Sequence, residues 1–231
     1  MNDHCQDLNG LLELVPSILG DEKNQYDDLR PIVVSHSMGG IVIMKYLEEM
    51  ANKNKKPKEI FSRIVSMCSV PPSGNGKSTM RVIRRSLIDA YKITVGFVLK
   101  KVVTDESICR QCFFGDDVTD SDIKRYQRYF GRDSKVVLDV RDLSKVLPSK
   151  SVDAAREGRA PFASDLPLCL VVGATDDFIV DEVSTMETAA YYAVNPVYID
   201  SSHDVMYVVI IHSDIYHQQM TNKFRLILVR F

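Results

Sequence analysis

Two short apolar runs rich in β-branched residues flank an amphipathic segment near the start of the chain. The run P-I-V-V-S at 31–35 predicts a buried strand, and residues 60–70 have the same pattern. Between them, residues 38–52 place apolar side chains at helical spacing and predict an amphipathic helix. Strand, helix and strand in this order form a βαβ unit, whose two strands are parallel. A further helix is predicted over residues 7–19, despite Pro16.

The pattern changes in the middle of the chain and then returns. Residues 79–147 show helical spacing, as at 82–91 and 121–130, and no convincing strand. Strand patterns reappear at 167–173 and 196–200, with a helix expected near 181–193. We therefore expect two α/β blocks around a helical insertion, with no internal repeat. The expected divisions are a first core part at 1–72, a helical cap at 73–165, a second core part at 166–206 and an atypical tail at 207–231.

The first predicted strand ends in the sequence V-S-H-S-M-G-G, which is typical of a nucleophile elbow. A serine in a tight strand-to-helix turn needs small residues two places to either side, and Ser37 has Ser35 and Gly39 there. The turn would present the Ser37 hydroxyl at the carboxyl edge of the sheet. It would also place the Met38 N–H at a helix start, where an oxyanion could bind.

Acidic residues and a histidine follow the two later strands, in the chain order of serine, acid and histidine that accompanies a nucleophile elbow. Asp176 and Asp177 come directly after the strand predicted at 167–173, and His203 follows the strand predicted at 196–200. Because parallel strands end at the same edge of a sheet, these side chains are expected to converge there. Either aspartate could orient a histidine that accepts the serine proton.

These residues resemble the α/β-hydrolase superfamily, in its capped branch of esterases, lipases and monoglyceride-lipase-like enzymes. The resemblance is carried by S-H-S-M-G-G at 35–40, G-A-T-D-D-F-I-V-D at 173–181 and S-S-H-D-V-M at 201–206. It implies an α/β fold with a mostly parallel sheet and a helical cap insertion, and hydrolysis of a carboxylic, lipid-like acyl ester. It implies neither a metal nor an organic cofactor.

The resemblance also implies the role of each site residue. Ser37 would be the nucleophile, His203 the general base and acid, and the Met38 N–H one oxyanion donor. The family pattern places the acid directly before x-Ile-Val, which selects Asp177, with Asp176 as the close alternative. His36 lies inside the elbow motif, where we expect it to pack and form hydrogen bonds.

The chain departs from the family at both ends. The family has several strands and an oxyanion loop before the elbow strand, whereas about 30 residues precede it here, without a His-Gly pair. We therefore expect a chain truncated at its N-terminus, with an open apolar edge on the elbow strand. The alternative function is a non-catalytic hydrolase-like binding protein or an inactive truncated isoform.

Composition narrows the class of partners. The formal net charge of −2 gives no indication of nucleic-acid binding. Residues 71–165 hold 18 basic and 13 acidic side chains, a net charge of +5, against 11 and 18 in the remainder. This basic middle segment predicts a solvated helical face, and the alternatives are anionic substrates or a membrane surface, with peripheral lipid contact through the cap.

The cysteines and the apolar runs indicate the compartment. Five cysteines without repeating spacing do not form a disulfide framework, and a single C-x-x-C at 109–112 is too little for a zinc site. No apolar run is long enough to span a bilayer, and the first residues lack the pattern of a signal peptide. We expect a cytoplasmic protein, although a targeting segment could have been lost with the missing front end.

Overall fold

The computed structural model describes residues 2–18, 30–116, 118–132, 147–150, 152, 158–206 and 226–230. The strands are β1 (Ile32–His36), β2 (Arg63–Met67), β3 (Leu168–Ala174), β4 (Val197–Ile199) and β5 (Leu226–Arg230). The α-helices are α1 (Asn2–Ile18), α2 (Met38–Asn52), α3 (Pro57–Ile60), α4 (Asn75–Arg85), α5 (Leu87–Val98), α6 (Glu106–Phe113), α7 (Asp120–Phe130) and α9 (Glu182–Tyr191). Short 3-10 turns lie at Lys101–Val103, Pro148–Lys150 and Ala163–Asp165.

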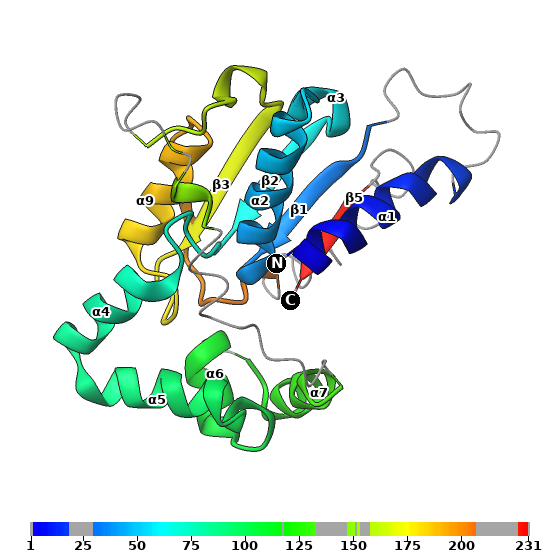
Figure 1. Ribbon diagram of the computed structural model, residues 1–231. Helices are drawn as coiled ribbons and strands as arrows, with labels where there is room; N and C mark the ends of the chain where they lie inside the picture. Colours follow the sequence, from blue (N-terminus) through cyan, green and yellow to red (C-terminus); the bar gives the residue numbers. More distant parts are fainter. Residues whose placement is uncertain are drawn as a thin grey trace.

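The strands form one parallel sheet in the order β4-β3-β2-β1-β5 (Figure 1). The chain runs outward from β1 through β2 and β3 to β4, and β5 then pairs with the opposite edge of β1. Strand order thus changes direction at β1, and such switch points are where open α/β sheets bind ligands, beyond the carboxyl ends of the strands. The parallel α/β class predicted from the sequence is confirmed.

The expected open edge of the elbow strand is not found, because β5 covers it. β5 pairs with β1 along its whole length, from Ile32 opposite Leu226 to His36 opposite Arg230. The sequence L-I-L-V-R has the apolar and β-branched character of a strand, and pairing satisfies the backbone groups that β1 would otherwise expose. Residues 207–225 of the predicted tail lie outside the described residues.

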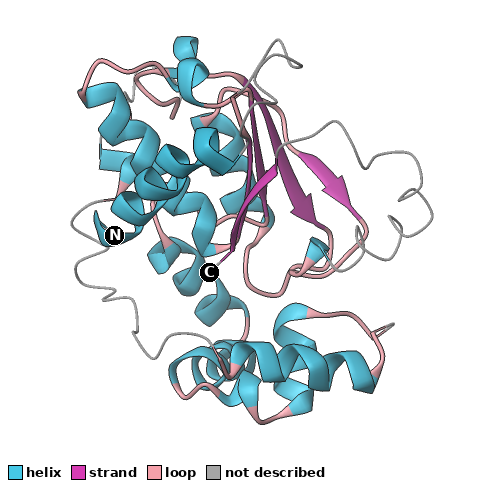
Figure 2. Ribbon diagram, turned by 90° about the vertical axis from the view of Figure 1, so that its right-hand side faces the viewer, coloured by secondary structure: helices cyan, strands magenta, loops and turns pink. Residues whose placement is uncertain are grey.

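Three helices cover one face of the sheet (Figure 2). α2 packs on β1, α9 packs on β3, and α1 lies against α2. The core between them includes Ile43, Met44 and Leu47 of α2, Phe61, Ile64 and Tyr191, all at most 1% exposed. On β3, Leu168 and Leu170 alternate with the more buried Cys169 and Val171, so they face the other side of the sheet and are exposed.

α2 approaches the end of β2 very closely at Gly40. A Cβ atom at this position would lie 1.8 Å from Ser69 Oγ and 2.6 Å from Ser69 Cβ. The second glycine of the M-G-G sequence is therefore needed for contact between the helix and the neighbouring loop. This contact fixes the position of the helix that begins directly after Ser37.

Helices α4 to α7 lie beyond the carboxyl ends of the strands (Figure 1). They have a core of their own, formed by Cys109, Phe114, Val118, Ile123 and Tyr126. The helical run predicted at 82–91 is divided into α4 and α5 at Ser86, whose extended backbone ends α4 and whose hydroxyl accepts the Asp89 N–H at the start of α5. α6 was not predicted as a separate element.

The remaining predicted elements agree with the structure to within about three residues, except that α1 begins at Asn2, five residues before the predicted start, and that a short helix lies near Lys56. The lysine-rich sequence K-N-K-K-P-K at 53–58 predicts a loop, but the structure has the short helix α3 there, which begins at Pro57, where proline is favoured. Within the described residues, no helix combines the length and the apolar character required to cross a bilayer.

Candidate active site

Ser37 lies in the sharp turn between β1 and α2. Its backbone has φ 51° and ψ −120°, which is an unusual conformation for a residue with a side chain. The turn is held by three backbone hydrogen bonds, from Ser37 N to Met67 O, from Gly40 N to Ser37 O and from Val70 N to Ser37 O. A serine that keeps this backbone because the surroundings enforce it has the geometry of a nucleophile elbow.

Met38 begins α2, and its N–H belongs to the first helical turn, where no earlier residue of the helix supplies a carbonyl acceptor. The positive end of the helix dipole lies at the same place. The position next to the Ser37 hydroxyl thus suits a developing negative charge.

His203 and Asp177 complete a chain of hydrogen bonds to Ser37. The Ser37 hydroxyl donates to His203 Nε2 at 3.0 Å. His203 Nδ1 lies 2.9 Å from both carboxylate oxygens of Asp177. The His203 side chain is fully buried, and that of Asp177 is 2% exposed. The structure therefore brings together the three side chains that the sequence selected.

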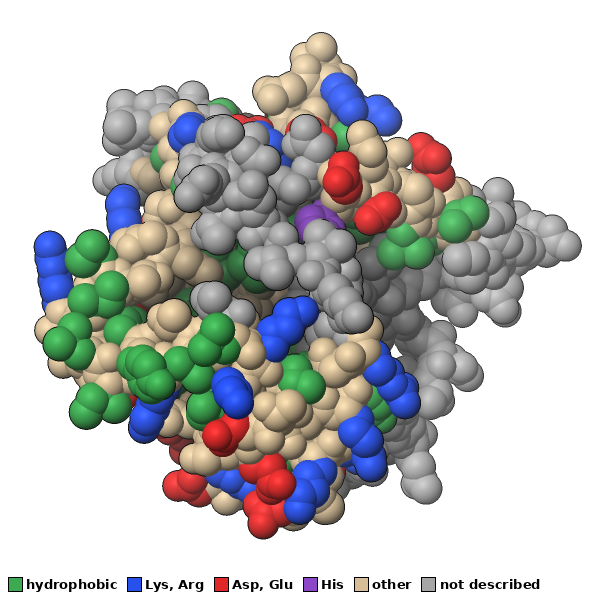
Figure 3. Space-filling view, turned by 60° about the horizontal axis from the view of Figure 1, so that its bottom comes forward, with side chains coloured by type: hydrophobic (Ala, Val, Ile, Leu, Met, Phe, Trp, Pro, Cys, Tyr) green, Lys and Arg blue, Asp and Glu red, His purple; other side chains and the backbone are tan. Residues whose placement is uncertain are grey.

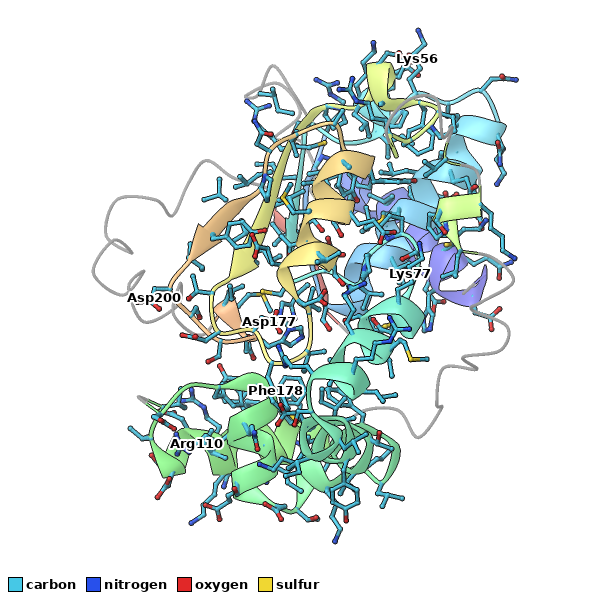
Figure 4. The ribbon with its side chains drawn as sticks, turned by 90° about the vertical axis from the view of Figure 1, so that its left-hand side faces the viewer. Lys56, Lys77, Arg110, Asp177, Phe178 and Asp200 are labelled. Atoms are coloured by element: carbon cyan, nitrogen blue, oxygen red, sulfur yellow. The ribbon has the colours of Figure 1, made fainter. Side chains whose placement is uncertain are left out.

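Asp177 is held in the ionised form. Burial alone would raise its pKa, but His203 and the backbone N–H groups of Ile179 and Val180 outweigh burial and lower it. Both N–H groups donate to Asp177 Oδ1 at 2.8 Å. Asp176, the alternative acid, is exposed. Figure 4 shows Asp177 at the end of the sheet that faces helices α4 to α7. Phe178, the next residue, lies between this end of the sheet and those helices.

His36 is buried directly behind the site. Its Nε2 donates to the backbone carbonyl of His203 at 2.8 Å, and the two rings lie 4.9 Å apart. This contact agrees with the expected packing and hydrogen-bonding role. Two further histidines, His212 and His217, belong to no motif of the sequence and lie outside the described residues.

Cys68 is a buried neighbour of the site. Its thiol lies within 4.8 Å of ligand atoms of Asp177 and His203, a grouping that could in principle hold a metal ion. Burial, followed by the negative charge of Asp177, raises the pKa of the Cys68 thiol, so the sulfur stays protonated. Because Asp177 and His203 also bind each other, the arrangement favours hydrogen bonding over metal ligation.

The Cys109 and Cys112 pair lies on α6, away from solvent. Burial raises the pKa of these thiols to about 12 and about 11. Both side chains are at most 1% exposed and belong to the interior of the helical segment. Neutral, inaccessible thiols are poor metal ligands and poor nucleophiles, so this pair has the properties of core residues.

Phe113 on α6 contacts the site from the helical segment. Its ring lies 5.9 Å from the ring of His203, and its backbone carbonyl accepts the N–H of Asp204 at 2.8 Å. Phe97 and Phe130 pack on the same ring, at 5.4 and 5.0 Å. No local sequence pattern indicates this contact, because an aromatic residue in a helix is ordinary and only the fold brings Phe113 to His203.

Arg81 on α4 connects the helical segment with the loop that carries Asp177. Its guanidinium contacts the carboxylate of Asp181 in a bidentate manner, at 2.5 and 2.7 Å, and donates to Ser184 Oγ at 2.9 Å. Asp181 also caps α9 by accepting the Ser184 N–H. Burial alone would raise the pKa of Asp181, but Arg81 and Ser184 lower it to about 2.

Replacing Asp181 with asparagine is expected to lower the free energy of unfolding by about 1 kcal/mol at neutral pH. Asparagine keeps the helix cap but loses the charged contact with Arg81. Because both side chains are partly exposed, solvent screening makes the loss of stability smaller than the pKa shift alone would imply. Because the pKa is lowered in the folded state, this contribution is present above about pH 4 and is lost as the pH falls toward 2.

Urea unfolding of the wild type and the variant, from about pH 7 to about pH 3, checks this prediction. The difference in free energy should shrink on acidification, and a constant difference would contradict it. Asp120→Asn is the matched control, because Asp120 also pairs with an arginine, Arg110, but its side chain is 79% exposed. We expect almost no effect from this change.

A comparison with protein families identifies the class of the fold and the site. The model described as "Alpha/beta hydrolase family" matches residues 2–209, so the chain belongs to the alpha/beta hydrolase family. A comparison with curated proteins finds no significant match.

Among solved structures, the chain resembles a protein assigned as the non-heme bromoperoxidase BpoC of Mycobacterium tuberculosis H37Rv, with 16% identity and a TM-score of 0.52 over 93% of this chain and 71% of that one. A carboxyl esterase of Bacillus coagulans is 14% identical, with a TM-score of 0.48 over 93% of this chain and 68% of that one. A carboxylesterase of Nitrososphaera gargenis is 15% identical, with a TM-score of 0.47 over 95% and 73%.

The chain spans between 64% and 73% of the length of the solved structures that it resembles. At such low identities a structural likeness bears on the fold alone. The likeness to the bromoperoxidase structure, with its TM-score of 0.52, agrees with the fold of the family.

Proposed function

We propose that this chain is a serine hydrolase that cleaves a carboxylic ester through Ser37, His203 and Asp177. The observation that carries the proposal is the hydrogen-bond chain from the Ser37 hydroxyl through both nitrogens of His203 to a buried, ionised Asp177. Nucleophile, base and orienting acid are thus already within the distances that proton transfer requires.

In the proposed reaction, Ser37 Oγ attacks the ester carbonyl carbon while its proton passes to His203 Nε2. The carbonyl oxygen becomes an oxyanion beside the Met38 N–H at the start of α2. The bond to the alcohol then breaks, and the alcohol oxygen takes the proton from His203. Water, deprotonated by His203, attacks the acyl-enzyme in the same way and releases the carboxylic acid with Ser37 restored.

Asp177 keeps His203 in the required tautomer throughout. With Nδ1–H donated to the carboxylate, Nε2 remains free to accept the serine proton. The charge of Asp177 also stabilises the imidazolium that forms in each step.

The helical segment is proposed to act as a cap that encloses the acyl group. Its aromatic side chains Phe97, Phe113 and Phe130 pack on one another, and Phe113 reaches the ring of His203. An apolar surface beside the proton-transferring histidine suits a lipid-like acyl chain and limits the access of water to the site. The proposed substrate class is therefore an ester of an apolar acid.

Labelling with a fluorophosphonate tests the proposed nucleophile. The reagent should attach to the wild type at one position, on Ser37 Oγ, because only an activated serine displaces its fluoride at an appreciable rate. The Ser37→Ala variant should remain unlabelled. Equal labelling of both proteins, or none of the wild type, would contradict the proposal.

A second candidate is a non-catalytic hydrolase-like binding protein or inactive isoform. It is favoured by one observation, since the described residues before β1 consist mainly of helix α1 and contain no His-Gly pair that could supply a second oxyanion donor. A missing second donor would cost about 10²- to 10³-fold in rate. Ser37-dependent turnover of a p-nitrophenyl ester would exclude this candidate.

The proposed compartment is the cytoplasm. All five cysteines are free thiols, which suits a reducing environment.

A further inference from the structure

Helices α4 and α5 carry an apolar surface that no described element covers. On α5, Leu87, Ile88 and Tyr91 are 73%, 68% and 68% exposed, and their spacing places them on one side of the helix. We call this surface the α4–α5 face, and its members are Met80, Ile83, Leu87, Ile88, Tyr91 and Leu99. In Figure 3, the apolar side chains of this part of the molecule gather together on the surface, beside several Lys and Arg side chains.

The exposure of this face does not result from a poorly packed helix. The opposite side of α5 packs tightly, since a Cβ atom on the buried Gly96 would lie 3.2 to 3.3 Å from side-chain atoms of Val102, Ile108 and Cys112. Gly96 is nine residues from Leu87, which corresponds to half a turn around the helix axis. One side of α5 therefore packs against the rest of the helical segment, and the other side is exposed.

The charge around the α4–α5 face is strongly positive. Residues 75–103 contain seven basic side chains, Lys77, Arg81, Arg84, Arg85, Lys92, Lys100 and Lys101, and one acidic side chain, Asp89. Among the described residues, Arg81 alone of the seven has a carboxylate partner. Lys92 lies toward the packed side of α5, near Cys112, so five basic side chains without an ion-pair partner among the described residues remain for the α4–α5 face.

We propose that the α4–α5 face docks on an anionic lipid surface. Apolar side chains that enter the boundary between headgroups and acyl chains, with basic side chains at the level of the phosphates, give a helix an in-plane position on a membrane. Each basic side chain near such a surface adds about 1 kcal/mol, or roughly a 5-fold increase in partitioning. Several exposed apolar side chains together with basic ones are more typical of an interaction surface than of a side of a protein that faces only water.

A second copy of the chain is a weaker choice of occupant for this face. In a symmetric dimer the same surface would meet itself, and the positive side chains of the two copies would oppose one another. An anionic bilayer instead complements both the apolar and the positive character of the surface. The inference does not depend on the proposed catalytic reaction, since the face includes none of its residues.

Sedimentation with phospholipid vesicles tests this proposal. The full chain should sediment with vesicles made of equal parts of phosphatidylcholine and phosphatidylglycerol, and much less with phosphatidylcholine alone. Replacing Leu87, Ile88 and Tyr91 with serine should lower the partition coefficient at least about 100-fold. Replacing Arg84 and Arg85 with glutamate should lower it about 30-fold or more. Added salt should weaken binding of the wild type.

Matched variants elsewhere on the chain separate this surface from general effects. Lys53→Glu with Lys55→Glu changes the charge equally at a remote exposed turn, and Leu11→Ser with Leu14→Ser removes exposed apolar side chains from α1. Both control variants should bind like the wild type. Far-UV circular dichroism verifies that each variant is folded.

The proposal is overturned if the wild type stays in the supernatant with anionic vesicles, or if the α4–α5 variants sediment as well as the controls. A dimer interface would also overturn it. In that case, sedimentation equilibrium would show a dimer of the wild type, the variant with serine at positions 87, 88 and 91 would be monomeric, and neither protein would bind vesicles. Hydrolysis of a monomeric p-nitrophenyl ester should be equal in all these variants. Vesicle binding is measured without turnover. A failure of the membrane proposal therefore shows as a loss of sedimentation with vesicles, and a failure of the proposed reaction shows as a lack of ester hydrolysis.

Discussion

Replacing Ser37 with alanine is expected to lower kcat for a p-nitrophenyl ester by about 10⁴- to 10⁶-fold. The substitution removes the atom that attacks the carbonyl and leaves only binding and oxyanion stabilisation, which accelerate the reaction modestly over water. Steady-state kinetics of the purified variant, with active-site titration of the wild type as reference, measure the loss. KM should change much less than kcat, because the serine hydroxyl contributes little to ground-state binding.

Ser35→Ala is the matched control for this experiment. Ser35 lies two residues away on the same strand, is fully buried and donates from its hydroxyl to the Val65 carbonyl at 3.3 Å. Loss of this bond should cost about 1 kcal/mol of stability and leave kcat close to that of the wild type. Comparable losses of activity in the two variants would mean that packing at the elbow, and not a nucleophile at Ser37, explains the result.

Replacing Asp177 with asparagine is expected to lower kcat by about 10⁴-fold while the protein stays folded. An asparagine amide can donate to His203 Nδ1, which would favour the tautomer with the proton on Nε2. His203 could then no longer accept the proton of Ser37 in the ground state. The variant should keep its thermal unfolding temperature within a few degrees, since the amide oxygen can still accept the N–H groups of Ile179 and Val180.

Asp176→Asn distinguishes the two candidate acids directly. Asp176 is exposed, and its backbone N–H donates to the Ser201 carbonyl, so its side chain can be changed with little effect on the loop. We expect kcat within about 2-fold of the wild type, as for an ordinary surface substitution. If Asp176→Asn proved as damaging as Asp177→Asn, the proposed division of roles between the two residues would be wrong.

Much of the core could be predicted because its signals are local. The run I-V-V-S-H, the amphipathic spacing after it and the similar runs near residues 64 and 170 each contain their own strand or helix pattern. Chain order and the parallel βαβ rule then place the ends of β1, β3 and β4 at one edge of the sheet. Ser37, the adjacent pair Asp176 and Asp177, and His203 follow from these strand ends, whereas the preference for Asp177 came from the resemblance to the family.

The contacts with the helical segment could not be predicted in this way. Nothing in the sequence around Phe113 or Arg81 marks a contact with residues about 90 to 100 positions away. Such contacts depend on how helices pack, and helical periodicity indicates which side is apolar but not which neighbour it meets. The role of β5 was missed for the same reason, because an apolar run shows that a strand is plausible without showing its partner.

The sequence by itself determined the parallel α/β core, the elbow at Ser37 and the order of acid and histidine, since local pattern and chain order are sufficient for these features. The tertiary structure shows which carboxylate contacts His203, because the two aspartates are adjacent in sequence and only Asp177 turns toward that histidine. It also decided that β5 closes the edge of β1 and that one side of α5 is left exposed. Each of these depends on which distant surfaces meet, and that is set by packing of the whole chain rather than by any short pattern in it.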